Sequence, residues 1–152
     1  MKTPATAMAA PLDRRMQPPS NATGALAGLR VVDLTQMLAG PFCTQILADH
    51  GADVIKVEAM TGDGTRITGP FREDDTLREF GGYFQSVNRN KRSIAVDLST
   101  EAGREIVRKL IDHADIVVEN FRAGVMERLG LSFETLRQTN PRLHAWMAGD
   151  AA

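Results

Sequence analysis

The chain has 152 residues, of which 43% are hydrophobic and 24% are charged. This length suffices for one domain with a core, and the composition is that of an ordinary globular protein. Eighteen basic residues against nineteen acidic ones leave a net charge of -1, so no overall field attracts nucleic acid or an anionic membrane. A single cysteine excludes an internal disulfide and favours a reducing compartment, which we expect to be the cytoplasm. No apolar run approaches the ~20 residues of a membrane span.

The first 25 residues are rich in Ala, Pro and Thr and lack the continuous apolar stretch of a secretory signal. We interpret residues 1–25 as a disordered leader. A mitochondrial transit peptide is the weaker alternative, because basic residues are few and Asp13 interrupts them. We expect residues 26–152 to form a single domain.

This domain begins with a strand-like apolar run at residues 29–34, followed by a helix predicted to start with Gly40 and Pro41 and to stop at Gly51. Residues 54–57 indicate a second buried strand, which completes a right-handed strand–helix–strand crossover. The apolar stripe of the helix, expected to face the sheet, consists of Phe42, Cys43, Ile46, Leu47 and His50.

Residues 59–82 interrupt the alternation with five glycines, one proline and charged runs. A loop of that length in a compact domain is usually functional or mobile. The following residues, 83–87, fit either a helical turn or a strand.

The alternation resumes with a strand at residues 93–97 and a helix that Ser99 is expected to cap. The predicted buried stripe of that helix is Ala102, Ile106, Val107, Leu110 and Ile111. The remaining predicted elements are a strand at 115–119, a short helix at 125–129 ended by Gly130, a helix from the Ser132 cap to Asn140, and a strand at 143–147.

Strands that alternate with helices predict an α/β fold, with a Rossmann-like, mostly parallel open sheet and helices on both faces. Ligands of such sheets bind outside the carboxyl ends of the strands. This rule selects three loops as candidate sites, at residues 36–41, 97–100 and 119–124.

The first loop leads into a helix whose free backbone N–H groups suit a phosphate or carbonyl oxygen. It lacks both the dinucleotide and the P-loop glycine motifs, and a plain crossover helix is the alternative. The third loop offers the Asn120 carboxamide, the Phe121 ring and the Arg122 guanidinium, which suit an amide, a flat ring and a phosphate. Arg128 could add a second cation; solvated arginines on a capped loop are the alternative.

Two further basic features have weaker claims. The cluster at residues 88–92 and the isolated Arg66 could each contact phosphate, but a solvated turn is the more common role. The three histidines show no metal-ligand spacing, and we assign no metal site. We expect Cys43 to be a core residue rather than a nucleophile.

Three stretches in fixed order, "LAGLRVVDLTQMLAGPFCTQILADHGADVIKVE", "GDGTR" and "NRNKRSIAVDLSTEAGREIVRKLIDHADIVVENFRAGVMERLGL", resemble the N-terminal part of the family III CoA-transferases of CaiB/BaiF type. That family includes formyl-CoA transferases and is similar to α-methylacyl-CoA racemases. The resemblance implies a CoA-binding Rossmann-like domain, a homodimer of interlocked chains, and an acyl-CoA and a carboxylic acid as substrates.

The resemblance also implies where coenzyme A would be held. Ala59 stands where the family has a basic residue, which removes one expected phosphate contact. The residues that match the family's CoA contacts are Leu38, Ala39, Val96, Asp97, Leu98, Ser99, Asn120, Phe121, Arg122 and Arg128.

The family's catalytic aspartate falls beyond the segment that follows Met147, and Asp150 does not occupy its place. We therefore assign no catalytic residue and expect a truncated large domain, the CoA-binding part of a CoA-transferase, which is inactive alone. The alternatives are a non-catalytic CoA-binding pseudo-subunit and a fragment of a racemase. A generic nucleotide-binding module is disfavoured because no glycine fingerprint is present.

Overall fold

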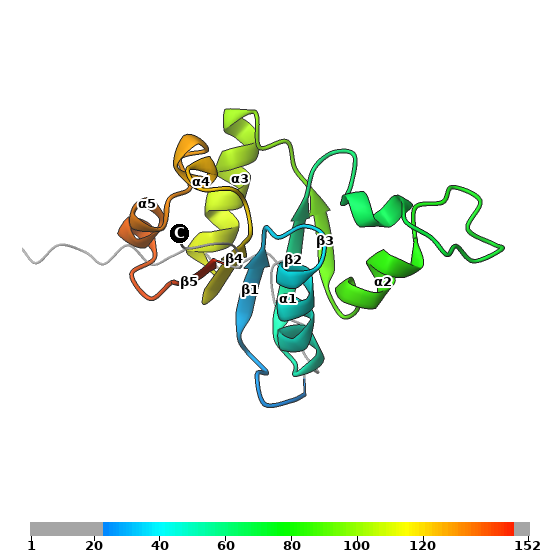
Figure 1. Ribbon diagram of the computed structural model, residues 1–152. Coiled ribbons are helices and arrows are strands. Elements are labelled where there is room, and N and C mark those ends of the chain that lie inside the picture. Colours follow the sequence, from blue (N-terminus) through cyan, green and yellow to red (C-terminus); the bar gives the residue numbers. More distant parts are fainter. Residues whose placement is uncertain (1–22, 148–152) are drawn as a thin grey trace, which may run out of the picture.

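The fold was analysed in a computed structural model, which describes residues 23–147. Five parallel strands form one sheet in the order β3-β2-β1-β4-β5 (Figure 1). The predicted parallel α/β sheet is therefore confirmed, with each strand within two residues of its predicted bounds. The strands are β1 (Arg30–Asp33), β2 (Asp53–Glu58), β3 (Arg92–Ala95), β4 (Ile116–Glu119) and β5 (His144–Met147).

Helices cover both faces of the sheet (Figure 1). The ambiguous segment at residues 83–87 is helical, and the long loop at 59–81 contains one 3-10 turn. No helix within residues 23–147 is both long and apolar enough to cross a bilayer. The helices are α1 (Ala39–Asp49), η2 (Gly64–Ile67), α2 (Gly82–Asn88), α3 (Glu101–Asp112), α4 (Val125–Arg128) and α5 (Phe133–Thr139).

The two faces of the sheet are filled differently. Val32 and Val117 point to the face where Val107 of α3 and Leu136 of α5 complete a large apolar core. On the opposite face, a small apolar cluster that includes Val31 and Ala48 lies beside buried charged residues. Burying charge is costly unless every group is paired, so this second face depends on its hydrogen bonds. The charged residues buried there include Asp33, Lys56, Glu58 and Asp63.

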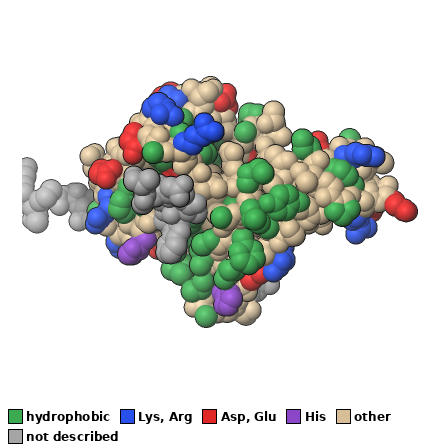
Figure 2. Space-filling view, in the orientation of Figure 1, with side chains coloured by type: hydrophobic (Ala, Val, Ile, Leu, Met, Phe, Trp, Pro, Cys, Tyr) green, Lys and Arg blue, Asp and Glu red, His purple; other side chains and the backbone are tan. Residues whose placement is uncertain are grey.

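Helix α1 buries a face that only partly matches the predicted stripe: Cys43 and Leu47 are half-buried, and Phe42, Ile46 and His50 are exposed. Phe42 and Ile46 are 50% and 43% exposed, and they contribute to the apolar surface seen over α1 in Figure 2. The prediction was wrong because α1 covers the charged face, where the hydroxyl of Thr44 donates to Asp33 at 2.6 Å. The residues of α1 that are buried are Gly40, Pro41, Thr44, Gln45 and Ala48.

Three predicted helix details also need correction. Helix α1 begins at Ala39, one residue before the predicted Gly40. Thr100, not Ser99, caps α3, because its hydroxyl accepts the Gly103 N–H at 3.0 Å. Within the predicted stripe of α3, Ile106 is exposed while Val107 and Ile111 are buried. Ala102 is exposed, and Gly103 is buried against the Asp97 carbonyl after β3, where only a residue without a side chain fits.

The order of the strands indicates where a ligand is expected to bind. The chain proceeds from β1 outward to β3 and then returns to place β4 on the other side of β1. The direction of winding reverses between β1 and β4. Open α/β sheets bind ligands at such a reversal, outside the carboxyl ends of the strands.

Candidate functional site

A pocket of about 490 Å³ lies at the carboxyl ends of the first three strands. One wall is the segment after β3, and another is the segment after β2. Its lining is mostly apolar with a few polar groups, which is the usual character of a small-molecule site. The lining residues are Leu34, Gln36, Val57, Glu58, Ala59, Met60, Thr61, Val96, Asp97, Leu98, Ser99, Phe121 and Leu129.

Half of the predicted binding residues line this pocket. Val96, Asp97, Leu98, Ser99 and Phe121 lie in its wall. The other predicted residues lie outside the lining, at the turn into α1 and the first residue of α1, on the loop after β4, and at the end of α4. These are Leu38, Ala39, Asn120, Arg122 and Arg128.

Asn120 connects two strand-end loops. Its Oδ1 accepts the Gln36 backbone N–H at 2.8 Å, and its Nδ2 donates to the Gln36 carbonyl at 2.8 Å. Both polar ends of the carboxamide are thus used to fix the loop after β1 against the loop after β4. This contact bridges the point where the sheet reverses its winding, so Asn120 shapes the edge around the pocket.

The wall after β3 is held by local hydrogen bonds. Asp97 Oδ1 accepts from the Ser99 backbone N–H at 2.9 Å and from the Ser99 hydroxyl at 2.6 Å. Arg104 of α3 donates to the carbonyls of Leu98 and Ser99 at 3.0 and 2.8 Å. The two hydrogen bonds from Ser99 lower the pKa of the Asp97 carboxyl and keep it ionised at neutral pH. The pocket wall therefore carries a fixed negative group.

Arg122 and Arg128 are exposed on the loop after β4 and on α4. Gly124 between them has a φ of 79° and starts α4. A Cβ atom at Gly124 would lie 3.3 Å from an Nη atom of Arg128, so that guanidinium folds back over the loop. Neither guanidinium has a hydrogen bond or ion pair to another residue in the described part of the chain, which leaves both available to an anion.

The three loops selected by the strand-end rule did not include the segment after β2, although the family resemblance had pointed to Ala59. Ala59, Met60 and Thr61 line the pocket, as does Gln36 after β1. The strand-end rule applies to β2 as it does to its neighbours, so the signal was present. The glycines and charges of residues 59–82 obscured it, because they identify a loop without showing where that loop returns to the sheet.

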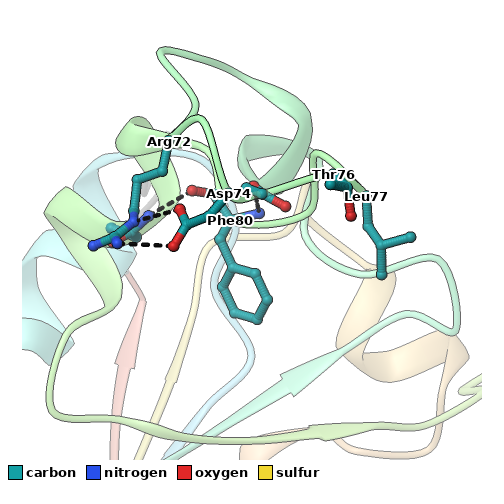
Figure 3. A pocket seen from close by; sticks show the side chains of 7 residues that line it. Arg72, Asp74, Thr76, Leu77 and Phe80 are labelled. Carbon is teal, nitrogen blue, oxygen red and sulfur yellow. Dashed lines mark hydrogen bonds and ion pairs between the residues drawn. The ribbon is translucent and has the colours of Figure 1, made fainter.

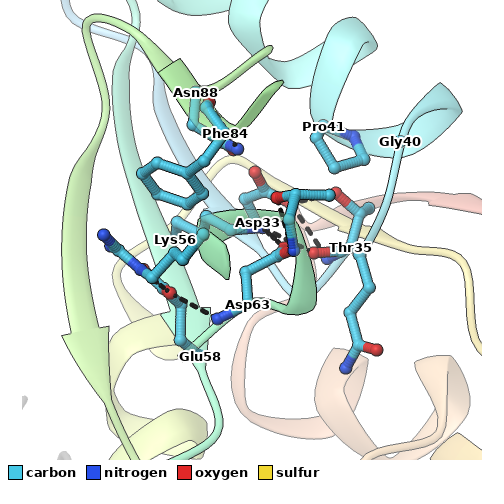
Figure 4. A network of polar contacts seen from close by, with 12 residues as sticks. Asp33, Thr35, Gly40, Pro41, Lys56, Glu58, Asp63, Phe84 and Asn88 are labelled. Atoms are coloured by element: carbon cyan, nitrogen blue, oxygen red, sulfur yellow. Dashed lines mark hydrogen bonds and ion pairs between the residues drawn. The ribbon is translucent and has the colours of Figure 1, made fainter. Parts of the chain in front are cut away.

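Beneath the pocket edge lies a layer of buried charges on the α1 and α2 face (Figure 4). Asp33 pairs with Lys91 at 3.0 Å, and Lys56 lies 2.9 Å from Asp63. The predicted solvated turn at residues 88–92 is therefore wrong for Lys91, whose side chain is 1% exposed. Burial lowers the pKa of the Lys91 ammonium to about 8, despite the opposing effect of Asp33. At pH 7 the group remains mostly charged.

Arg66 is also committed within the protein. Its guanidinium donates to both oxygens of Glu58 at 2.6 and 2.7 Å and stacks over the Phe84 ring at 3.7 Å. Burial alone would raise the pKa of Glu58, but hydrogen bonds from Arg66, Ser93 and the Asp63 N–H outweigh it and lower that pKa. Arg66 is thus a structural cation, and the predicted alternative of a phosphate contact is not supported.

The Glu58 pair predicts a specific acid sensitivity. Because the pKa of Glu58 is lower in the folded protein than its ordinary value of 4.5, the unfolded chain binds more protons between the two values. The free energy of unfolding should therefore fall as pH falls from 4.5 through the folded pKa. Glu58→Gln should reduce this slope in urea titrations from about pH 5 to pH 3. Glu134→Gln, at an exposed acid on α5, is the control, and an equal slope in all three proteins would contradict the prediction.

Two other candidates carry little chemistry. Burial and the Asp33 carboxylate raise the pKa of the half-buried Cys43, which disfavours a nucleophilic thiolate. A second pocket, of about 440 Å³, is formed by the 59–81 loop and α2, and Figure 3 shows the Arg72 side chain directed at Asp74 within it. The charge of Arg72 is therefore already neutralised by Asp74.

Residues 23–147 contain no group of three or more His, Cys, Asp or Glu side chains arranged to hold a metal ion.

The sequence matches the model of CoA-transferase family III over residues 26–144. Succinyl-CoA:mesaconate CoA-transferase of Haloarcula hispanica is 57% identical over 120 residues, covering 79% of this chain and 30% of that protein. Acetyl-CoA:oxalate CoA-transferase of Acetobacter aceti is 47% identical over 126 residues, covering 82% of this chain and 31% of that protein. The chain thus spans about 30% of the length of these curated relatives.

The fold has matching solved structures. A CaiB/BaiF family protein from Brucella suis superposes with a TM-score of 0.76 at 48% identity, covering 81% of this chain and 32% of that one. Rv3272 from Mycobacterium tuberculosis gives a TM-score of 0.75 at 43% identity and covers 82% of this chain and 34% of that one. The family match over residues 26–144 includes all three stretches on which the resemblance to an N-terminal portion was based.

Proposed function

The chain belongs to CoA-transferase family III, and from this premise we propose that it binds coenzyme A or an acyl-CoA at the carboxyl edge of its sheet. The observation that carries the proposal is the convergence of three strand-end segments on one pocket, with two unpaired arginines beside it. The apolar walls suit the pantetheine arm and the adenine ring. Arg122 and Arg128 suit the phosphates, because a guanidinium can bind two phosphate oxygens at once.

We further propose that this CoA site serves transfer of CoA between an acyl-CoA and a carboxylic acid, as the names of the relatives describe for those proteins. A homodimer and a cytoplasmic location belong to the same proposal. Within the described pocket, Glu58 is held by Arg66 and Asp97 by Ser99. Both carboxylates are thus engaged, which favours a covalent step carried by a residue elsewhere in the enzyme.

The second candidate is a non-catalytic CoA-binding subunit, which the engaged carboxylates of the pocket also support. The two candidates differ in one measurement. A transferase exchanges CoA between an acyl-CoA and a free carboxylic acid, whereas a binding subunit retains the acyl-CoA unchanged. Because the chain alone is expected to be inactive, the test uses a chimera in which residues 26–144 replace the matching part of the Haloarcula hispanica transferase. Mass spectrometry of the acyl-CoA after incubation with a second acid then separates the two candidates.

Coenzyme A titrated calorimetrically into the chain of 152 residues tests the binding proposal. Arg122→Ala and Arg128→Ala should each weaken binding about tenfold, because a hydrogen bond to a charged group contributes about 1.5–3 kcal/mol. The control is Arg142→Ala. Arg142 is exposed and precedes β5, so it lies at the amino ends of the strands, away from the pocket at their carboxyl ends.

The outcomes of this titration are distinct. Equal binding of NAD and coenzyme A would indicate a generic nucleotide module and contradict the proposal. Unchanged affinity in both pocket variants would remove the arginines from the site. Equal weakening by Arg142→Ala would show that the effect comes from net charge alone.

A further inference from the structure

The turn between β1 and α1, residues 34–38 and here called the first turn, leads into the predicted binding edge. We propose that the buried lysines Lys56 and Lys91 are positioning residues that hold the first turn in the conformation that receives the ligand. Neither lysine is a predicted contact of coenzyme A, and both act through the main chain and Asp33. The identity of the ligand rests on the proposed function, whereas the ordering of the turn does not.

Lys56 holds the first turn from below. Its ammonium donates to the Thr35 carbonyl at 2.7 Å and lies 2.9 Å from Asp63 Oδ2, with both side chains 1% exposed. That second contact is ionic, with an angle outside hydrogen-bond geometry. Asp63 is itself fixed by the N–H and hydroxyl of Thr65 at 2.8 and 2.7 Å. Lys56 therefore joins the first turn to the 59–81 loop across the sheet.

Lys91 holds the two flanks of the first turn. Its ammonium donates to Asp33 at 3.0 Å, before the turn, and to the Pro41 carbonyl at 2.8 Å, after it. A third bond, to Asn88 Oδ1 at 2.8 Å, uses the last N–H of the group. With three donors and three acceptors, the buried ammonium is fully satisfied. Its contacts with Asp33 and the Pro41 carbonyl fix the start of α1 relative to the end of β1.

Asp33 carries this restraint into the turn itself. Its Oδ1 accepts from the Thr35 N–H at 2.9 Å and from the Thr35 hydroxyl, while its Oδ2 binds Thr44 and Lys91. A carboxylate that receives four donors has little freedom to rotate. The buried charges thus determine the main-chain path of the turn at Thr35.

The exposed part of the turn has a conformation that needs such support. Met37 has a φ of 68°, a left-handed value that costs a residue with a side chain about 1–3 kcal/mol. Such residues persist when the surrounding structure fixes them. Gln36 beside it is bound to Asn120, and Leu38 is 52% exposed. The lysines and Asp33 on the buried side, and Asn120 on the open side, supply the required restraint.

Another ion pair of the sheet provides a comparison, with the Asp53 side chain 4% exposed and the Arg92 side chain 39% exposed. Arg92 donates to both oxygens of Asp53 at 2.9 and 2.6 Å, where β2 and β3 begin. This pair lies at the amino ends of the strands, whereas the first turn lies at their carboxyl ends. Removing this pair should cost global stability without affecting the turn, whereas removing Lys56 should affect both.

The test compares two double variants of the full chain. Lys56→Met/Asp63→Asn removes both charges together, so no unpaired buried charge remains. The asparagine side-chain oxygen can still accept the hydrogen bonds from the Thr65 N–H and hydroxyl. Hydrogen exchange by NMR is measured at the Thr35 and Gln36 amides, with the affinity for coenzyme A measured alongside. We expect at least tenfold faster exchange at both amides and at least tenfold weaker binding. Arg92→Met/Asp53→Asn should leave exchange and affinity within about twofold of the wild type.

A folded Lys56→Met/Asp63→Asn protein with wild-type exchange at Gln36 overturns the positioning role. So does equal acceleration in the Arg92→Met/Asp53→Asn control, which would indicate a general loss of stability. Should the first double variant lose its cooperative unfolding transition, Lys56→Gln is measured in its place, because it removes the ammonium that binds the Thr35 carbonyl and Asp63. At least tenfold faster exchange at Gln36 is again expected, and wild-type exchange in this variant overturns the positioning role. If the wild type binds no coenzyme A, the proposed function fails and the exchange measurements still decide the positioning role.

Discussion

Replacement of Lys91 by methionine should lower the free energy of unfolding by about 3–5 kcal/mol. Methionine fills most of the volume of the lysine stem but offers no donor to Asp33, Pro41 and Asn88. The Asp33 carboxylate, fully buried, would then lack its ionic partner. A buried charge without its counter-charge is among the costliest defects that a single substitution can introduce.

Urea denaturation at pH 7 measures this effect, with the control Lys109→Met. Lys109 is 67% exposed and lies 3.7 Å from Glu105 on the surface of α3, so its loss should change stability by less than about 0.5 kcal/mol. Adding Asp33→Asn to Lys91→Met should restore part of the loss, because the unpaired charge disappears. A loss below about 1 kcal/mol for Lys91→Met would contradict the prediction.

Gly103→Ala should lower the free energy of unfolding by about 3 kcal/mol, although alanine is the better helix former by about 1 kcal/mol. A Cβ atom at this position would lie 1.9 Å from the Asp97 carbonyl oxygen, a main-chain atom that cannot rotate away. The start of α3 would have to move away from the segment after β3. That segment forms the pocket wall at residues 96–99, so affinity for coenzyme A should fall as well.

The matched substitution is Gly64→Ala. A Cβ atom there would meet no atom within 4 Å, and the backbone of Gly64 is not in a left-handed conformation. Its stability should stay within about 0.5 kcal/mol of the wild type in the same urea titration. Similar effects of the two alanines would show that the close approach of α3 to Asp97 is unimportant.

The architecture could be predicted from the sequence because apolar residues recur with different periods in strands and in helices. Apolar runs such as Val31 and Val32, and stops such as Gly51 with its φ of 100°, mark elements by local chemistry alone. The face that α1 buries could not be predicted in this way. Phe42 and Ile46 form the more apolar stripe, and only the presence of Asp33 and Lys91 beneath the helix makes Thr44 the inward residue.

The site was predictable only in part for a related reason. The strand-end rule and the family resemblance selected the wall after β3 and the ring of Phe121, which line the pocket. They did not show that the Asn120 carboxamide binds Gln36, or that Arg66 binds Glu58. The identity of a basic or amide residue does not reveal whether its side chain binds a ligand or another part of the protein. Partners more than 80 residues apart in sequence, as for Asn120 and Gln36, become visible only when the chain is folded.

The unequal filling of the two sheet faces has a consequence for temperature. The apolar core beneath α3 and α5 contributes less on cooling, because the hydrophobic effect weakens as temperature falls. The charged layer beneath α1 and α2 behaves in the opposite way on heating, because the penalty for stripping water from its ions decreases. One sheet thus combines a face that weakens in the cold with a face whose ion pairs cost less in the heat, and the first turn is anchored to the latter.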